Sequence, residues 1–237
     1  MAGAADRPVL SVVIPFFNEE RAIERVVEQW TATLNGLGVA YEFRAYDDCS
    51  RDGSWAVLSG LTGRFPRLVL SRNAANLGHG PTIHRGYRES RGDWVFQTDG
   101  DNEIAPDHFR ALWDGREGKD IVIGRRRFEK RPWPRRLISW VSRSLIKIWT
   151  GRTLDVNVPY RLVKKQKLDE ALACIPERTF APNVAMSALA CKRGWAISEI
   201  DVVSRERSTG QVSIRKWGLW KAALKSFLQT AVILVRS

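Results

Sequence analysis

Short apolar runs alternate with amphipathic segments over the first half of the chain. Runs rich in branched and aromatic residues predict five strands, at 10–16, 41–47, 67–71, 94–97 and 119–123. Apolar residues at helical spacing predict helices after the first three strands, as in Ala22, Ile23, Val26, Val27, Trp30 and Leu34. This alternation predicts an α/β protein with a mostly parallel central sheet and helices on both faces.

Polar side chains gather where the predicted strands end. Asn18 and Glu19 follow the first strand, Asp47 and Asp48 close the second, and the stretch 99–103 follows the fourth. Gly124 and Arg125 follow the fifth strand. Ligands of open α/β sheets bind at the carboxyl ends of the strands, so we expect one site there. No linker or repeat interrupts the chain, and we expect residues 1–237 to form a single domain.

Asp99, Gly100 and Asp101 follow a buried strand directly. Alternate side chains of an extended segment point the same way, so both carboxylates can face one cation. Glu103 can add a third oxygen. Oxygen ligands suit magnesium or manganese. The three cysteines and three histidines have no metal-binding spacing, so zinc is not expected.

The net charge of +12 comes from one part of the chain. Residues 125–167 contain fourteen Lys and Arg and only two acidic residues, whereas the remainder is neutral. Concentrated charge of this kind favours an anionic partner, such as phosphate groups, nucleic acid or an anionic membrane. A solvated basic face is the alternative.

The second half contains two amphipathic segments. Residues 132–149 have an apolar face, a basic face and flanking tryptophans, which is typical of a helix lying in a membrane interface, although a helix packed on the sheet has the same pattern. Residues 217–235 resemble this segment, and packing is the stronger interpretation there. The longest apolar run, 231–235, is too short to cross a bilayer and no signal region is apparent, so we expect a cytoplasmic protein.

An ordered series of motifs resembles glycosyltransferase family 2, whose members have the GT-A fold. The series comprises Val13-Ile-Pro15-Phe-Phe-Asn18-Glu19, Asp47-Asp48-Cys-Ser50-Arg-Asp52-Gly53, Asn76-Leu-Gly78-His-Gly80 and Asp99-Gly-Asp101. In the second half it continues with Gly124-Arg125, Arg135-Arg-Leu-Ile-Ser139, Tyr160-Arg161-Leu162 and Arg207-Ser-Thr-Gly210. Within the family the chain is most similar to the dolichyl-phosphate mannose synthase and polyprenyl-phosphate glycosyltransferase branch.

The resemblance implies roles for particular residues. The residues implied to bind the nucleotide are Pro15, Phe17, Glu19, Asp47, Asp48 and Asp99. The residues implied to bind the divalent cation, Mg or Mn, are Asp99, Asp101 and Glu103. The residues implied to bind the diphosphate and the acceptor phosphate are Arg125, Arg135, Ser139 and Arg207. The implied catalytic residues are Asp101, Arg125 and Arg135. Residues 9–124 then form the nucleotide-sugar-binding half, and residues 125–237 the acceptor-side, membrane-facing half with amphipathic interfacial helices.

The implied reaction is metal-dependent, inverting transfer of a sugar from a nucleoside-diphosphate sugar to a polyprenyl phosphate. Carboxylate-held metal and arginines neutralise the departing diphosphate. A phosphate monoester, with a second pKa of about 6, is an anionic nucleophile near neutral pH and needs no general base. The basic stretch suits this acceptor and an anionic membrane surface, so we expect a peripheral protein on the inner membrane face. A separate membrane protein as a further partner stays open.

Two alternatives remain. A family 2 enzyme that uses a saccharide or protein hydroxyl acceptor needs a catalytic base, for which Asp107 or Glu103 is available. A nucleic-acid-binding protein explains the basic stretch with interleaved tryptophans but leaves the carboxylates at the strand ends without a role. We therefore expect no nucleic-acid partner.

Overall fold

A computed structural model describes residues 7–127, 154, 158–204 and 216–237, with side chains described for all of these except 127 and 216–223. Within these ranges the backbone forms one seven-stranded sheet, in the order β3-β2-β1-β4-β6-β5-β7. The strands are β1 Leu10–Phe16, β2 Tyr41–Asp47, β3 Leu68–Arg72, β4 Trp94–Thr98, β5 Ile121–Arg127, β6 Tyr160–Lys164 and β7 Ile197–Val203. Only β6 among them runs antiparallel to its neighbours.

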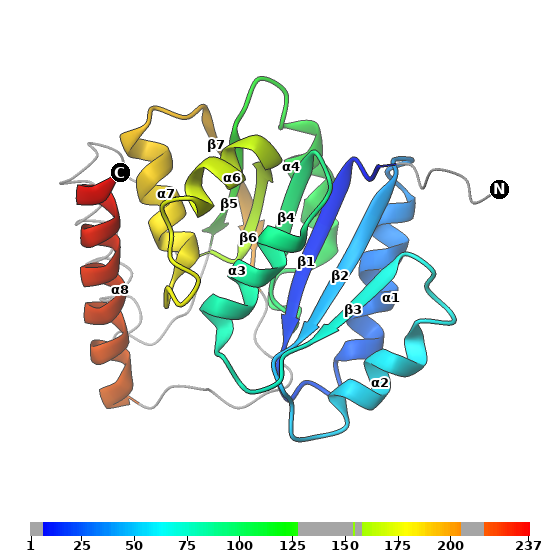
Figure 1. Ribbon diagram of the computed structural model, residues 1–237. Coiled ribbons are helices and arrows are strands. Elements are labelled where there is room, and N and C mark those ends of the chain that lie inside the picture. The colour runs from blue at the N-terminus through cyan, green and yellow to red at the C-terminus, as the bar shows by residue number, and fades with distance from the viewer. Residues whose placement is uncertain (1–6, 128–153, 155–157, 205–215) are drawn as a thin grey trace.

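Helices cover both faces of the sheet (Figure 1). The described helices are α1 Ile23–Asn35, α2 Ser54–Leu61, α3 His79–Glu89, η1 Pro106–His108, α4 Phe109–Asp114, α6 Lys165–Leu172, α7 Pro182–Lys192 and α8 Lys216–Arg236. In Figure 1, α3, α6 and α7 lie in front of the sheet and α1 and α4 behind it, and α8 stands outside α7. The predicted mostly parallel α/β architecture is therefore confirmed.

Strand β1 shows why these residues form the centre of the sheet. All seven of its residues are buried. Leu10, Val12, Ile14 and Phe16 face the core beneath α1 and α4, whereas Val13 faces the core beneath α3, α6 and α7. Burial of one such side chain contributes roughly 1.5–3 kcal/mol. A strand that is apolar on both faces must therefore lie between two layers of helices.

Five strands occur where the hydrophobic pattern predicts them, and β5 extends further, to Arg127. The pattern did not predict β6 and β7. β6 is only five residues long and contains Arg161 and Lys164, so its composition resembles a basic loop. It becomes a strand because it fills the space between β4 and β5, with Gln97 opposite Arg161. The insertion of β6 also separates β4 from β5.

The basic stretch does not form one continuous surface among its described residues. Arg161 is fully buried and donates hydrogen bonds to the carbonyl oxygens of Val158 and Asn183. Lys164 pairs with Trp94 at the start of β4, so the lysines that open α6 lie at the amino ends of the parallel strands. Arg125 and Arg126 lie at the opposite, carboxyl edge. The predicted interfacial helix at 132–149 lies outside the described residues.

The C-terminal segment is helical, as its pattern predicts. Leu224, Leu228 and Val232 of α8 are each about half exposed. The polar residue Gln229 is partly exposed and accepts a hydrogen bond from the backbone N–H of Phe180. Across the part of the chain that the structure describes, no helix combines the length and apolar composition needed to span a bilayer.

Candidate active site

The loops after β1 and β2 are joined by reciprocal hydrogen bonds. The backbone N–H of Asn18 donates to Ser50 Oγ (3.0 Å), and the backbone N–H of Arg51 donates to Asn18 Oδ1 (2.9 Å). Asn18 has a φ of 54° and Cys49 a φ of 57°, in the left-handed region that few residues other than glycine adopt. These bonds hold the two loops together at the carboxyl edge of the sheet.

Asp47 and Asp48, predicted to bind nucleotide, contact the protein itself. Buried Asp47 forms an ion pair with Arg72 (3.0 Å) and accepts from the backbone N–H of Ser50. Asp48 accepts from the backbone N–H groups of Leu77 (2.9 Å) and Gly78 (2.8 Å). Both carboxylates therefore shape the loops of the site, and their contact with nucleotide stays a prediction.

The Asp99–Glu103 turn packs directly against the end of β1. A side-chain Cβ at Gly100 would lie 2.5 Å from Phe16 and 2.8 Å from the carbonyl oxygen of Pro15, so only glycine fits between the two acidic residues. Phe17, the next residue after β1, is 38% exposed. The structure thus brings Pro15 and the acidic turn together, and the next residue but one along the chain, Phe17, has an accessible side chain.

Asp99 directly follows β4, and its side chain contacts His79, the first residue of α3. His79 Nε2 lies 2.8 Å from Asp99 Oδ1, and Gln97 Nε2 donates to the same oxygen (3.1 Å). Burial alone would lower the pKa of His79, but the carboxylates of Asp99, Asp101 and Asp48 raise it overall. The imidazole therefore carries positive charge more readily than an isolated histidine does.

Asp101 and Glu103 have different environments. Asp101 is 7% exposed, and its Oδ1 accepts from the backbone N–H of Glu103 (3.1 Å). Glu103 forms an ion pair with Arg126 of β5 (3.3 Å) and accepts from Ser204 Oγ (2.8 Å). The Glu103 side chain thus connects the acidic turn to β5 and to the end of β7.

Arg125 lies beside this region, but it points elsewhere. It is half exposed and forms an ion pair with Asp201 of β7 (2.8 Å). The other predicted phosphate-binding residues, Arg135, Ser139 and Arg207, lie outside the described residues. The acceptor side of the site therefore rests on Arg125 among the described residues, and its role stays a prediction.

The chemistry of the acidic turn suits a hard divalent cation, because Asp99, Asp101 and Glu103 supply only oxygen donors. Within the described ranges, however, no three acidic, histidine or cysteine side chains are arranged as a ready-made metal site. Asp99 contacts His79, and Glu103 contacts Arg126. Binding of a cation through all three predicted ligands thus requires side-chain rearrangement.

The predicted site residues did not include His79, Gln97 or Arg126. His79 lies in the glycine-containing segment 76–80, and its position after a strand was the available signal. Arg126 neighbours Arg125, and strand alternation points the two side chains to opposite faces. Gln97 lies inside a predicted strand, and its polarity at a buried position was the only signal.

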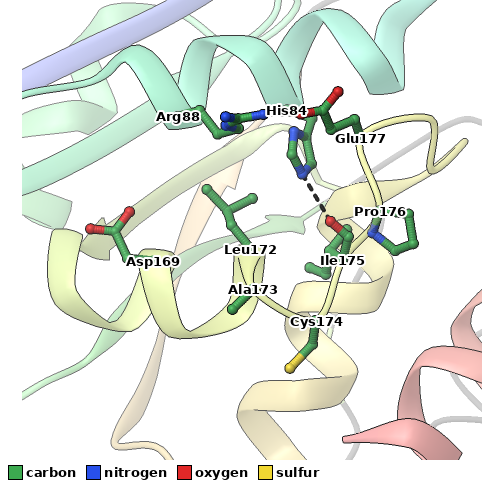
Figure 2. A pocket seen from close by; sticks show the side chains of 9 residues that line it. All are labelled: His84, Arg88, Asp169, Leu172, Ala173, Cys174, Ile175, Pro176 and Glu177. Carbon is green, nitrogen blue, oxygen red and sulfur yellow. Dashed lines mark hydrogen bonds and ion pairs between the residues drawn. The ribbon is translucent and has the colours of Figure 1, made fainter.

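A separate cavity of about 510 Å³ lies between α3, α6 and the turn that follows α6 (Figure 2). His84 Nε2 donates to the carbonyl oxygen of Ile175 (2.9 Å) at its wall, and Arg88 pairs with Glu177. None of the residues predicted to bind nucleotide, cation or phosphate lines this cavity. The candidate site is therefore the carboxyl edge of the sheet.

Comparison with known proteins gives many similar proteins, among them two bacterial enzymes. Both are named undecaprenyl-phosphate 4-deoxy-4-formamido-L-arabinose transferase. The one from Pseudomonas paraeruginosa (strain DSM 24068 / PA7) is 32% identical over 216 residues, and the one from Proteus mirabilis (strain HI4320) is 29% identical over 207 residues. The alignments cover 86% and 85% of this chain but only 59% and 61% of those enzymes. The chain thus spans about three fifths of their length.

Solved structures share the fold. Glucosyl-3-phosphoglycerate synthase from Mycobacterium tuberculosis, solved with Mn²⁺, UDP and glucosyl-3-phosphoglycerate, superposes with a TM-score of 0.69 and 18% sequence identity. The match covers 95% of this chain and 80% of that one. The GT-A type of fold expected from the motifs is therefore confirmed.

A sequence model of one family covers most of the region that forms the sheet and the acidic turn. It matches residues 11–172, from β1 to the last residue of α6, and its description is "Glycosyl transferase family 2". The match therefore includes the joined loops after β1 and β2, the α3 entry with His79, and Asp99 to Glu103. This chain belongs to glycosyl transferase family 2.

Proposed function

We propose that this protein transfers a sugar from a nucleoside-diphosphate sugar to a polyprenyl phosphate, with inversion at the anomeric carbon and with a divalent cation. The observation that carries the proposal is the meeting of the Asp99–Glu103 turn with the end of β1 and the start of α3, in a family 2 glycosyltransferase. The similar enzymes named as undecaprenyl-phosphate transferases support the lipid acceptor.

We assign donor binding to residues 9–124. Phe17, the residue that follows β1, has an accessible side chain that is suited to contact a nucleotide base. Asp99, Asp101 and Glu103 are the residues that would hold Mg²⁺ or Mn²⁺, as the Mn²⁺ and UDP bound by the structurally similar synthase support. The cation would supply positive charge where the diphosphate develops negative charge.

We assign acceptor binding to residues 125–237. Arg125 and the basic residues Arg135 and Arg207 would contact the acceptor phosphate, because guanidinium groups bind phosphate oxygens in a bidentate manner. A phosphate oxygen attacks the anomeric carbon and forms the new C–O bond. The bond from that carbon to the diphosphate breaks, and the nucleoside diphosphate leaves with the electron pair. No proton needs to be removed from the nucleophile.

We place the protein at the inner face of the membrane, as a peripheral protein. The half-exposed apolar side chains of α8 support this placement, since a membrane surface covers such a stripe. The net charge of +12 favours a surface of anionic lipid.

The test is transfer of radiolabelled sugar from a panel of UDP- and GDP-sugars, with Mg²⁺ or Mn²⁺, into an organic phase that contains polyprenyl phosphate. We expect lipid-extractable label that a chelator abolishes. Donor hydrolysis without labelled lipid would instead indicate a hydroxyl acceptor. Absence of both reactions with every donor would contradict the proposal.

Asp101→Asn provides the matched variant. We expect it to abolish metal-dependent transfer and to leave the circular dichroism spectrum unchanged, because the amide retains the size of the carboxylate but loses its charge. Asp107→Asn, which alters a carboxylate just beyond the turn, serves as the control for the phosphate acceptor. Transfer to polyprenyl phosphate should survive in it, since that acceptor needs no general base.

A further inference from the structure

A row of buried hydrogen bonds runs from the core to Asp99. The hydroxyl of Tyr87 on α3 donates to Asn183 Oδ1 at the start of α7 (2.7 Å). Asn183 Nδ2 donates to Gln97 Oε1 on β4 (2.8 Å), and Gln97 Nε2 donates to Asp99 Oδ1 (3.1 Å). We refer to Tyr87, Asn183 and Gln97 as the relay. It joins three separate elements to one carboxylate of the candidate site.

The relay has a defined direction. The Asn183 oxygen accepts from the Tyr87 hydroxyl, and the Asn183 amide nitrogen faces Gln97. The Gln97 nitrogen must then face Asp99, and an ionised carboxylate can only accept. Burial raises the pKa of Tyr87, which keeps the hydroxyl protonated. The carboxylate end of the relay therefore fixes the orientation of the two amides, and the Tyr87 hydroxyl is the donor at the other end.

The side chains of the relay are polar groups at buried positions, where polar groups are unfavourable unless they are hydrogen-bonded. Tyr87 and Gln97 are fully buried, and Asn183, in the first turn of α7, is 9% exposed. A buried amide that lacks its hydrogen bonds destabilises the fold, so apolar residues would serve packing alone better. Arg161, also fully buried, donates to the backbone carbonyl of Asn183 (2.8 Å) and fixes its position.

We propose that Tyr87, Asn183 and Gln97 are positioning residues that set the direction in which Asp99 presents its carboxylate to the nucleotide and its cation. The relay holds Asp99 Oδ1 from the buried side, while His79 holds the same oxygen from the side of α3. None of the three relay residues contacts substrate in this assignment. The inference rests on the proposed function, because it takes Asp99 as part of the donor site.

The test combines two measurements on the purified chain. Side-chain amide signals in ¹H–¹⁵N NMR spectra, without ligand, report the relay itself, and Gln97→Met identifies the Gln97 signals by their loss. Calorimetric titration with UDP or GDP in the presence of Mn²⁺ reports the effect on the site. Tyr87→Phe removes only the hydroxyl at the start of the relay.

We expect Tyr87→Phe to shift the Gln97 amide signals and to weaken nucleotide binding about tenfold. Gln97→Met should weaken it at least as much, and the double variant no more than Gln97→Met alone, because the effect of Tyr87 passes through Gln97. Tyr41→Phe is the matched control. Tyr41 lies at the amino end of β2, away from the candidate site, and its hydroxyl donates to Asn35 of α1. This variant should change neither measurement.

Each contrary result has a distinct meaning. Unchanged Gln97 signals in Tyr87→Phe would overturn the relay. Shifted signals with undiminished nucleotide binding, or additive losses in the double variant, would overturn its positioning role. If the unaltered chain binds neither nucleotide, the proposed function fails and the positioning role with it, whereas the NMR response still reports whether the hydrogen bonds exist. Should Tyr87→Phe not fold, Gln97→Met and Asn183→Leu, compared with Tyr41→Phe, give the same binding test.

Discussion

Arg125 and Arg126 are neighbours in β5, but they have opposite environments. Arg126 is mostly buried and pairs with Glu103, whereas Arg125 is half exposed and pairs with Asp201. We expect Arg126→Ala to raise the Mn²⁺ concentration for half-maximal transfer about tenfold, because it removes the partner that orients Glu103. Arg125→Ala should instead raise the KM for the lipid acceptor.

Steady-state kinetics with each substrate varied in turn would separate the two effects. Equal changes in the half-maximal Mn²⁺ concentration and in the KM for the lipid acceptor, in both variants, would contradict the distinction between the arginines. Circular dichroism of each variant is the folding control, since Arg126 is buried against the acidic turn.

At the residue scale, the sequence predicted the acidic residues of the candidate site but not which groups they contact. Asp99, Asp101 and Glu103 are recognisable because they follow a predicted strand at close spacing. Their contacts with His79 and Arg126 are not, since those partners come from other elements. A carboxylate's neighbours depend on packing, which local pattern does not encode.

At the element scale, replacing glycine by alanine should change the free energy of unfolding in opposite directions at two positions. A Cβ at Gly80, in the first turn of α3, would lie 2.3 Å from the carbonyl oxygen of Phe180. No atom lies within 4 Å of a Cβ at Gly60 in α2. We expect Gly80→Ala to lower the free energy of unfolding by about 1–3 kcal/mol and Gly60→Ala to raise it by up to about 1 kcal/mol.

Urea denaturation of the two variants would measure both changes. The prediction for Gly80 fails if its variant is as stable as the parent, because the close contact is with backbone that cannot rotate away. Loss of stability in Gly60→Ala would contradict the open surroundings of α2.

Also at the element scale, helix α8 is the element that we expect to contact the membrane. We expect Leu224→Ser/Leu228→Ser to reduce co-sedimentation with anionic phospholipid vesicles about tenfold or more, because both side chains are over half exposed and apolar. Leu77→Ser/Val203→Ser is the matched control, since these residues are similarly exposed elsewhere. A similar loss in both double variants would argue against α8 as the membrane-contacting element.

At the scale of the whole molecule, stability should depend on a buried ion pair in β2. Glu42 pairs with Arg44 (2.9 Å) and accepts from Ser11 Oγ (2.6 Å), and both Arg44 and Ser11 are buried. Burial opposes ionisation, but the hydrogen bonds from Ser11 and Arg91 and the charge of Arg44 outweigh it and hold the pKa of Glu42 below its usual value.

A lowered pKa in the folded state stabilises the protein above the ordinary glutamate pKa of about 4.3 and ceases to do so as the pH falls through the lower, folded value. We expect Glu42→Gln to cost about 2–4 kcal/mol at pH 7, and the difference from the parent to shrink below pH 4. Denaturation at a series of pH values measures this. A pH-independent difference would contradict the assignment, and Glu24→Gln, at an exposed pair with Arg64, should cost under about 1 kcal/mol.

The sequence by itself determined the α/β class, the five strands it predicted and the family. Strand and helix periodicity are local properties, and the motifs of the family lie within single loops. It also located the acidic turn, because a carboxylate pair after a buried strand is visible over a few residues.

Only the tertiary structure decided which groups surround these carboxylates. Gln97 and Asn183 are 86 residues apart, yet they share a hydrogen bond beneath the site. Asp47 pairs with Arg72, Asp48 accepts from the backbone N–H of Gly78, and Arg161 of the basic stretch lies in the core. Such contacts follow from how α3, α7 and the antiparallel strand β6 pack on the sheet, which depends on the whole chain at once.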